Sequence, residues 1–302
     1  MKNQWDSQHI PDQTGKVILI TGATSGLGKE AASVLAGKHA TIILAARDLA
    51  KARAVVQEIR QTTPDARLHV HALDLNSLQS VQHFAGEVLR TYPRLDVLIN
   101  NAGIMACPYA KTEDGFEVQM GVNHLGHFAL TGLLMPLLTT TPQSRIVATS
   151  SIAHQQGKIN FEDFHWEKRP YNTMQAYSDS KIANLYFAYE LTRRLKSSPK
   201  APLITAAHPG WTSTELQRHS RLARVLNPVF SQPLSMGVLP TLRAACEAQA
   251  QPGTYFGPSG FMEMRGYPVV VSSNALSHQE TPARRLWELS ETLTQVVYPV
   301  LS

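Results

Sequence analysis

Short apolar runs alternate with longer stretches of helical character between residues 16 and 207. A brief apolar run bounded by turn residues is typical of a strand that is buried on both faces. We expect strands at 16–20, 41–46, 68–73, 95–99, 145–149 and 203–207. The helices expected between them include 49–60, 78–91, 116–138 and 176–196.

This alternation predicts an α/β fold in which a parallel sheet is covered by helices on both faces. No Gly/Ser-rich or Pro-rich linker divides the 302 residues, so we expect a single domain over 1–302. A last stretch, 282–297, reads as an amphipathic helix over the sheet edge or over a neighbouring subunit. Its pattern leaves both options open. Ligands in such a fold bind at the C-terminal ends of the strands.

A glycine-rich turn follows the first expected strand and leads into a helix, with the sequence Thr-Gly-Ala-Thr-Ser-Gly-Leu-Gly at 21–28. Gly22 permits the tight turn, Gly26 lets the backbone approach a diphosphate, and Gly28 lets the helix pack on the sheet. The helix N-terminus then faces the phosphates. This context favours dinucleotide binding over an ordinary turn. The residues expected to contact the dinucleotide here are Thr21, Gly22, Ser25, Gly26, Leu27 and Gly28.

The second expected strand ends at Arg47 and Asp48, where such folds bind the adenine-side ribose. An acidic residue directly after the strand would bind a free 2′-hydroxyl, whereas the Arg47 guanidinium can bind a 2′-phosphate through paired charge-assisted bonds. We therefore expect NADP(H) rather than NAD(H). In the alternative, Arg47 only caps the strand end. Asp48 is expected to cap the following helix, which is compatible with either option.

The charge balance and the cysteines narrow the class of protein. The chain has 28 Lys and Arg against 23 Asp and Glu, spread along the sequence, which indicates solubility and no nucleic-acid partner. Two cysteines, Cys107 and Cys246, with no signal-like start, favour thiols in a reducing compartment, and we expect a cytoplasmic protein. No run reaches the ~18 apolar residues that span a bilayer, so no transmembrane segment is expected.

A phenol and an ammonium are expected on one helix face, because Tyr177 and Lys181 stand four residues apart in the stretch 176–196. An unperturbed phenol has a pKa near ~10, and a nearby cation lowers that value. We expect Lys181 to lower the pKa of Tyr177 and so to suit it to proton transfer. Ser151 would add a hydrogen-bond donor at a developing alkoxide.

Three further motifs follow the later strands: Asn-Asn-Ala-Gly at 100–103, Ser-Ser at 150–151 and His-Pro-Gly-Trp-Thr at 208–212. Together with the glycine-rich turn and Tyr-x-x-x-Lys, in this order, they closely resemble the short-chain dehydrogenase/reductase family. The resemblance covers about residues 15–210. It implies a Rossmann-type doubly wound parallel sheet that binds a nicotinamide cofactor.

The resemblance also implies roles for single residues. Tyr177 would be the general acid or base, while Lys181 would lower its pKa and bind the nicotinamide ribose. Ser151 would hold the substrate oxygen, because family members with a Ser-Ser pair usually use the second serine rather than, here, Ser150. Asn123 would support a water that links Lys181 to solvent; the alternative is a polar residue that kinks a buried helix. The further cofactor contacts implied are Asp74, Leu75, Asn101, Ala102, Gly103, Tyr177, Lys181, Pro209, Gly210 and Thr212.

One departure from many family members is the length of the segment between Ser151 and Tyr177, which has 25 residues. With Ser-Ser-x-Ala-His and His-Pro-Gly-x-x-x-Thr-Glu-Leu, it is similar to the branch that contains retinol dehydrogenases, WW-domain oxidoreductases and protochlorophyllide reductases. That branch favours bulky apolar carbonyls or alcohols and mostly NADP(H). Vertebrate retinol dehydrogenases often begin with a membrane anchor, which the polar start here does not predict.

Residues 211–260 are the least family-like part of the chain, and we expect a substrate lid there. Arg218, Arg221 and Arg224 suit either a basic face on an anionic bilayer or a solvated charged face, and we prefer the second. The same range contains apolar residues that could line the lid, although many of them could instead belong to the core. The apolar residues suited to the lid are Leu216, Leu222, Val225, Leu226, Val229, Phe230, Leu234 and Met236.

The sequence predicts an oxidoreductase that transfers a hydride between NADP(H) and the carbonyl or alcohol group of an apolar, retinoid-like or steroid-like molecule. The alternatives are an NAD-linked alcohol dehydrogenase and a non-catalytic nucleotide-sensing protein, against which the intact Tyr177 and Lys181 argue. No metal site is expected, because the pairs His124–His127 and His69–His71 lack a third ligand. Family likeness suggests dimers or tetramers, although members of the branch can be monomers.

Overall fold

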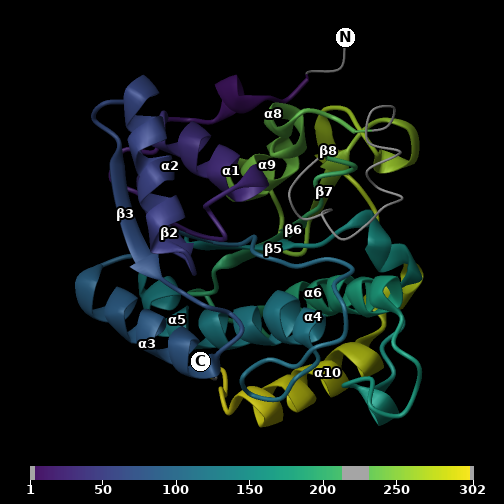
Figure 1. Ribbon diagram of the computed structural model, residues 1–302. Helices are drawn as coiled ribbons and strands as arrows, with labels where there is room; N and C mark the ends of the chain where they lie inside the picture. The colour runs from purple at the N-terminus through teal and green to yellow at the C-terminus, as the bar shows by residue number, and fades with distance from the viewer. Residues whose placement is uncertain (1–3, 213–230, 300–302) are drawn as a thin grey trace.

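A single eight-stranded sheet organises the computed structural model, which describes residues 4–212 and 231–299 (Figure 1). Within these ranges the strand order is β3-β2-β1-β4-β5-β6-β7-β8. Neighbouring strands are parallel except for β7 and β8, which are antiparallel. The strands are β1 (Val17–Thr21), β2 (Thr41–Ala46), β3 (Arg67–Ala72), β4 (Val97–Asn100), β5 (Arg145–Thr149), β6 (Leu203–Ala207), β7 (Tyr255–Pro258) and β8 (Pro268–Val270).

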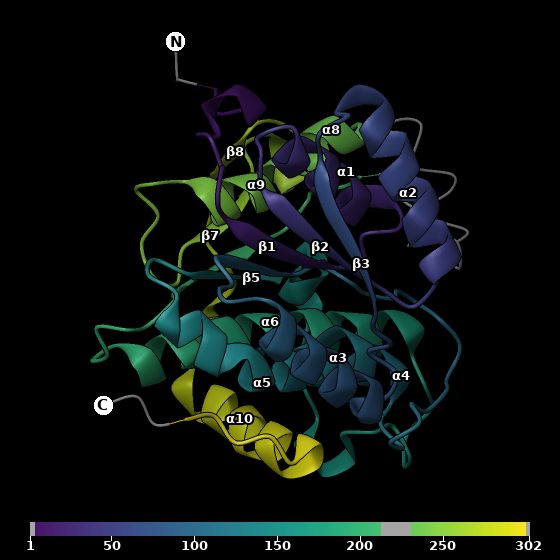
Figure 2. The same cartoon turned by 90° about the vertical axis from the view of Figure 1, so that its left-hand side faces the viewer.

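Helices cover both faces of the sheet (Figure 2). One face carries α1 (Gly26–Ala36), α2 (Leu49–Thr62), α8 (Leu234–Gly237) and α9 (Leu239–Cys246). The other face carries α3 (Leu78–Thr91), α4 (Val118–Met120), the π-helix η2 (Gly121–Leu125), α5 (Gly126–Thr140) and α6 (Thr173–Leu195), with α10 (Glu280–Thr294) outside them. Short 3-10 helices are η1 (Ser7–His9), η3 (Ile152–Gln156), η4 (Phe161–Asp163), η6 (Phe261–Glu263) and η7 (Ala275–His278).

The core lies in two layers because successive side chains of a strand point to opposite faces of the sheet. All five residues of β1 are buried. Ile18 and Ile20 pack with the helices on one face, together with Leu35 of α1. Leu19, between them, packs on the other face with Phe128 of α5. Burial on both faces explains why β1 reads as a continuous apolar run.

The C-terminal helix α10 forms a further layer outside α6 rather than covering the sheet edge. Its Trp287 is 2% exposed and stacks on Phe187 of α6, with ring centroids 6.1 Å apart and an interplanar angle of 9°. The Arg194 guanidinium lies over the same indole at 4.6 Å from its centroid. These contacts tie α10 to the helix that carries Tyr177.

The predicted α/β fold is confirmed as one domain, and all six expected strands are present. Three strands are shifted: β1 begins and ends one residue later than 16–20, β3 begins and ends one residue earlier than 68–73, and β4 spans 97–100 rather than 95–99. The helix expected at 116–138 begins as α4 and passes through the π-helix η2 before α5. Neither β7 nor β8 was expected, and β7 lies inside the range assigned to the lid.

Candidate active site

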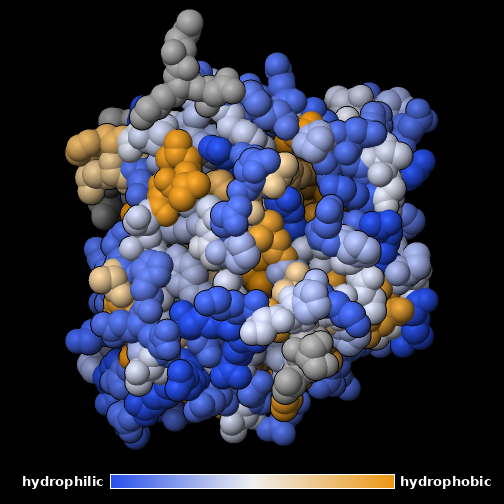
Figure 3. All heavy atoms as spheres, turned by 180° about the vertical axis from the view of Figure 1, so that it is seen from behind, coloured by the Kyte–Doolittle hydropathy of each residue, from blue (hydrophilic) through white to orange (hydrophobic). Residues whose placement is uncertain are grey.

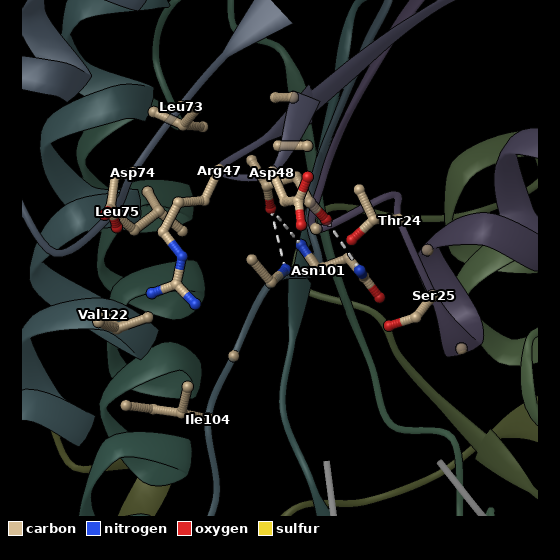
Figure 4. Close-up of a pocket in the computed structure, with 18 of the residues that line it drawn as sticks. Thr24, Ser25, Arg47, Asp48, Leu73, Asp74, Leu75, Asn101, Ile104 and Val122 are labelled. Carbon is tan, nitrogen blue, oxygen red and sulfur yellow. Dashed lines mark hydrogen bonds between the residues drawn. The ribbon is translucent and has the colours of Figure 1, made fainter. Parts of the chain in front are cut away.

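A cavity of about 410 Å³ lies where the C-terminal ends of β1 and β4 meet and the strand order reverses (Figure 4). Ligands in doubly wound sheets bind in this crevice. Side chains and backbone from the glycine-rich turn, the end of β2, the end of β3 and the end of β4 line it. The expected cofactor residues among them are Thr21, Gly22, Ser25, Gly26, Leu27, Gly28, Arg47, Asp74, Leu75, Asn101, Ala102 and Gly103.

The glycine-rich turn is shaped for a close backbone approach. Gly22 has φ +68° and Gly26 has φ +51°, which are conformations that favour glycine. A Cβ at Gly28 would lie 2.4 Å from the carbonyl oxygen of Gly22, so only glycine lets α1 start this close to the turn. Ser25, the N-cap residue of α1, makes no side-chain capping bond. The first amides of α1 therefore suit an anionic group in the cavity, as a nucleotide diphosphate requires.

Thr21 joins the ends of β1 and β4. Its Oγ1 accepts hydrogen bonds from the amides of Asn101 and Ala102, both at 2.9 Å. The Thr21 hydroxyl also lies 2.9 Å from Nε2 of His127, whose Nδ1 lies 3.0 Å from the Asn123 carbonyl oxygen. Because that carbonyl can only accept, Nδ1 carries the proton and Nε2 accepts from Thr21. Burial lowers the pKa of His127 to about 4, which keeps the ring neutral.

The sequence reasoning missed this role of His127, because it considered His124 and His127 only as metal ligands. A histidine four residues after Asn123 on a helix was the available signal, since the two positions share a face. His124 also serves a hydrogen bond, with Nε2 2.9 Å from the Ser290 hydroxyl of α10.

Two cationic side chains line the cavity beyond the end of β2. The Arg47 side chain extends into the cavity (Figure 4). Asp48 caps α2 as expected, accepting from the amide of Lys51 at 3.0 Å. Lys51 lines the cavity as well, which the sequence reasoning did not anticipate. Two positive side chains thus border the part of the cavity where the adenine-side ribose binds in this fold.

Tyr177 and Lys181 are both buried on α6, with 4% and 3% of their surface exposed. The Lys181 Nζ lies 5.5 Å from the centroid of the Tyr177 ring and donates to the Thr149 carbonyl oxygen at 3.4 Å. Ser150 uses its hydroxyl to donate to the Lys181 carbonyl oxygen at 2.9 Å, so it anchors α6 to the end of β5. Ser151 is partly exposed and hydrogen-bonds the phenol of Tyr177.

The pKa shifts differ from the sequence expectation for Tyr177. Burial raises the pKa of Tyr177 to about 12, and the hydrogen bond with Ser151 opposes this rise without reversing it. Burial also lowers the pKa of Lys181 to about 8. The expected lowering of the phenol pKa by Lys181 is therefore wrong for the protein alone, because desolvation of the phenolate raises this pKa by more than the hydrogen bond with Ser151 lowers it.

Asn123 holds the end of β4 from the π-helix η2. Its Oδ1 accepts from the Ile104 amide at 2.8 Å, and its Nδ2 donates to the Ile104 carbonyl oxygen at 2.9 Å and to the Ser180 hydroxyl at 2.9 Å. A Cβ at Gly103 would lie 3.1 Å from Asn123 Oδ1 and 3.5 Å from Lys181 Nζ. Asn123, Gly103 and Lys181 thus converge, and π-helical turns are frequent at functional sites.

The remaining predicted residues lie at the end of β6, outside the residues that line the cavity. Thr212 donates from Oγ1 to the Pro209 carbonyl oxygen at 2.8 Å, and Gly210 has φ +64°. Six of the apolar lid residues and the three arginines fall within 213–230, outside the described residues. Leu234 and Met236 are described, but β7 and most of α9 are buried in the sheet and its cover. Within the expected lid, β7 and most of α9 are therefore core, whereas Leu234 and Met236 are only partly buried.

Among the residues that the structure describes, no helix is both long and apolar enough to cross a bilayer. The face turned away from the viewer in Figure 1 is mostly hydrophilic, with apolar atoms in separate groups (Figure 3). Scattered apolar groups of this kind are usual on protein surfaces.

Known proteins resemble this chain over most of its length. The family described as short chain dehydrogenase matches residues 16–224. Human retinol dehydrogenase 13 is 40% identical over 296 residues, which cover 94% of this chain and 86% of the relative. The crystal structure of an uncharacterized protein from Mycobacterium paratuberculosis is 40% identical with a TM-score of 0.84 and covers 98% of this chain and 100% of that chain. A short chain dehydrogenase from Shigella flexneri complexed with NADP is 25% identical with a TM-score of 0.64, covering 81% and 97%.

The chain therefore belongs to the short-chain dehydrogenase family, and it is an oxidoreductase whose fold binds a nicotinamide cofactor. Within the family it falls in the retinol dehydrogenase-like branch, as the long segment between Ser151 and Tyr177 predicted.

Proposed function

We propose that this protein is an NADP(H)-dependent reductase of bulky apolar carbonyl compounds, of which retinoids are one class. The observation that carries the proposal is the convergence of Tyr177, Lys181 and Ser151 at the C-terminal ends of β4 and β5, beside the glycine-rich cavity. The names of the relatives, retinol dehydrogenases 13 and 14, support the substrate class.

The residues at β1, β2 and β4 fit a bound dinucleotide. The amides at the start of α1 would hold its diphosphate, since Gly22, Gly26 and Gly28 keep side chains out of the way. Asp74 and Leu75 would lie beside the adenine ring, with the strand end 101–103 along the ribose. The cofactor supplies the hydride, and the protein sets its position. Pro209, Gly210 and Thr212 would bound the nicotinamide end.

The protonation state of Tyr177 supports a role as proton donor when the reaction runs in the reducing direction. A phenol with a pKa of about 12 is neutral at physiological pH, so it can donate a proton to a substrate oxygen. Ser151 would hold the same oxygen with its hydroxyl, and the Lys181 ammonium would stabilise the phenolate left behind. Asn123 would support the water through which Lys181 exchanges protons with solvent.

The preference for NADP(H) rests on Arg47 and Lys51. Both line the cavity at the end of β2, and two cations there favour a 2′-phosphate over a free hydroxyl. Replacing Arg47 with Ala should raise the KM for NADPH by roughly ten-fold or more while leaving the KM for NADH within about two-fold, because one charge-assisted contact to phosphate is lost. Arg53→Ala, which removes an exposed arginine of the adjoining helix α2, is the matched control. A preference for NADH that Arg47→Ala leaves unchanged would contradict the NADP(H) assignment.

Replacing Tyr177 with Phe tests the function itself. We expect the variant to bind NADPH as the wild type does, and to lose turnover of an aldehyde or ketone by roughly 100-fold or more, because only the proton donor is removed. The measurement is NADPH absorbance over a panel containing a retinoid, a steroid and a quinone. Tyr186→Phe, in the same buried helix, is the control. Turnover near the wild-type level in Tyr177→Phe would show that another group donates the proton.

The remaining assignments stay predictions. We propose one functional unit over 1–302, with the cofactor bound by about 15–210 and the lid confined to the part of 211–260 that is not core. A cytoplasmic location and a homo-oligomer are expected and would be checked by fractionation and by light scattering.

A further inference from the structure

His208 lies buried directly before the Pro209–Thr212 loop, and its surface is 0% exposed. Its amide donates to the Phe256 carbonyl oxygen at 3.0 Å, which extends the pairing of β6 with β7. The ring has a partner on each nitrogen. Nε2 lies 2.9 Å from Oε2 of Glu263, and Nδ1 accepts from the amide of Gly210 at 3.3 Å.

These two contacts assign the tautomer of His208. A backbone N–H can only donate, so the Nδ1 that faces Gly210 must carry a lone pair. In the neutral ring the proton then lies on Nε2 and is donated to the Glu263 carboxylate. The carboxylate therefore selects the tautomer, and the tautomer provides the acceptor for the Gly210 amide.

The backbone around His208 is closely fitted to this pair. A Cβ at Gly257 of β7 would lie 2.1 Å from His208 Nε2, so a glycine is required to seat the ring. A Cβ at Gly210 would lie 2.4 Å from the Met264 carbonyl oxygen, which also accepts from the Trp211 amide at 2.7 Å. The loop after β6 and the segment around Glu263 thus pack closely against each other.

The segment that presents Glu263 adopts an unusual conformation. Met262 has φ 51° and Glu263 has φ 56°, and two consecutive residues other than glycine are rare in the left-handed region. Such backbone persists where surrounding contacts hold it, and it is concentrated at functional sites. The bond between Glu263 and His208 is one contact that holds it.

We propose that Glu263 acts through His208 as a positioning residue for the Pro209–Thr212 loop and hence for the nicotinamide end of the cofactor. This inference rests on the proposed function, in which that loop bounds the nicotinamide. Glu263 touches neither substrate nor cofactor in this role. It determines which ring nitrogen of His208 carries the proton, and the other nitrogen accepts the hydrogen bond that holds the Gly210 amide in place.

Binding of two ligands to Glu263→Ala tests the proposal. Calorimetry is carried out with NADP⁺ and with 2′-phospho-ADP-ribose, which lacks the nicotinamide. We expect the variant to bind NADP⁺ about ten-fold more weakly and to bind 2′-phospho-ADP-ribose within about two-fold of the wild type, because a hydrogen bond to a charged group is lost only at the nicotinamide end. Glu263→Gln keeps an acceptor for the Nε2 proton and should restore NADP⁺ binding to within about two-fold of the wild type.

Glu247→Ala is the matched control, because it removes another partly buried carboxylate, paired with Arg243 Nε at 3.0 Å. Equal weakening of both ligands by Glu263→Ala, or no weakening of either, would overturn the positioning role. If the wild type binds neither ligand, the proposed function fails and the inference fails with it. The ¹⁵N shifts of His208 in the wild type give a second test that does not depend on any variant folding. They should show the neutral Nε2–H tautomer, and an Nδ1–H tautomer would overturn the proposal.

Discussion

At the scale of single residues, the role proposed for Lys181 and the stability of the fold make opposite demands on its charge. Burial lowers the pKa of Lys181 from 10.5 to about 8, which means that the folded protein disfavours the charged form. Each unit of pKa shift corresponds to about 1.4 kcal/mol, so the buried charge costs the fold roughly 3 kcal/mol at neutral pH. The same charge is the one that would stabilise a phenolate at Tyr177.

Replacing Lys181 with Met should therefore stabilise the protein while it removes turnover. The folded pKa lies below the unfolded one, so the unfolded chain binds more protons between pH 8 and 10.5 and the penalty disappears as pH rises through that window. Urea denaturation should show a gain of up to about 3 kcal/mol at pH 7 and about 1 kcal/mol at pH 9.5. Lys196→Met, exposed at the end of α6, should change neither value. A Lys181→Met variant that is less stable than wild type at pH 7 would contradict this account.

At the scale of elements, the contact between α1 and the glycine-rich turn leaves no room for a side chain at Gly28. The Cβ of an alanine would meet the Gly22 carbonyl oxygen at 2.4 Å, and backbone cannot give way as a flexible side chain does. Gly28→Ala should cost about 1–3 kcal/mol of unfolding free energy and weaken NADPH binding. Gly37 ends the same helix with φ −64° and its Cβ would have contacts of 3.5 Å, so Gly37→Ala should be neutral or stabilise by up to about 1 kcal/mol. Equal effects of the two variants on thermal unfolding and binding would contradict the steric argument.

Elements that bury a continuous apolar run could be predicted from sequence. The bounds of β2 and α3 match the prediction, because turn residues flank both segments. The strand β7 was missed because Tyr-Phe-Gly-Pro, at 255–258, contains two residues that are rare in strand interiors. Its strand geometry comes from pairing with β6, which joins residues about fifty positions apart. The π-helix η2 was missed because one inserted residue leaves the apolar pattern of a buried helix unchanged.

Some features of the candidate site could likewise be predicted from the sequence, and others could not. Tyr177 and Lys181 could be placed together because one helical turn separates them. The partners Thr21 and His127 could not, since they are 106 positions apart and meet only through the sheet. The direction of the pKa shift at Tyr177 was also beyond the sequence, because the extent of burial decides it and only the packed structure sets that extent.

At the scale of the whole molecule, two buried histidines connect the sheet to the outermost helix. His127 reaches Thr21 at the end of β1, and His124 reaches Ser290 of α10. Burial lowers their pKa values to about 4 and about 3. Both rings are therefore neutral in the folded protein at pH 5, where most histidines of the unfolded chain are protonated. We therefore expect acid to destabilise the folded protein through these buried rings.

Each neutral buried histidine should lower the stability of the fold by about 2 kcal/mol between pH 7 and pH 5, because the unfolded chain binds protons that the folded chain excludes. Burial lowers the pKa of His69, His154 and His165 as well, so they add to the same slope. A double variant, His124→Leu with Ser290→Ala, removes one histidine together with its hydroxyl partner, so that only Asn184 loses a hydrogen bond to the ring. In urea denaturation it should lose about 2 kcal/mol less than the wild type over this pH range, whatever its stability at pH 7. If the two proteins lose the same free energy, His124 is not excluded from protonation by the fold, and the acid sensitivity of the molecule must arise from other titratable groups, His127 among them.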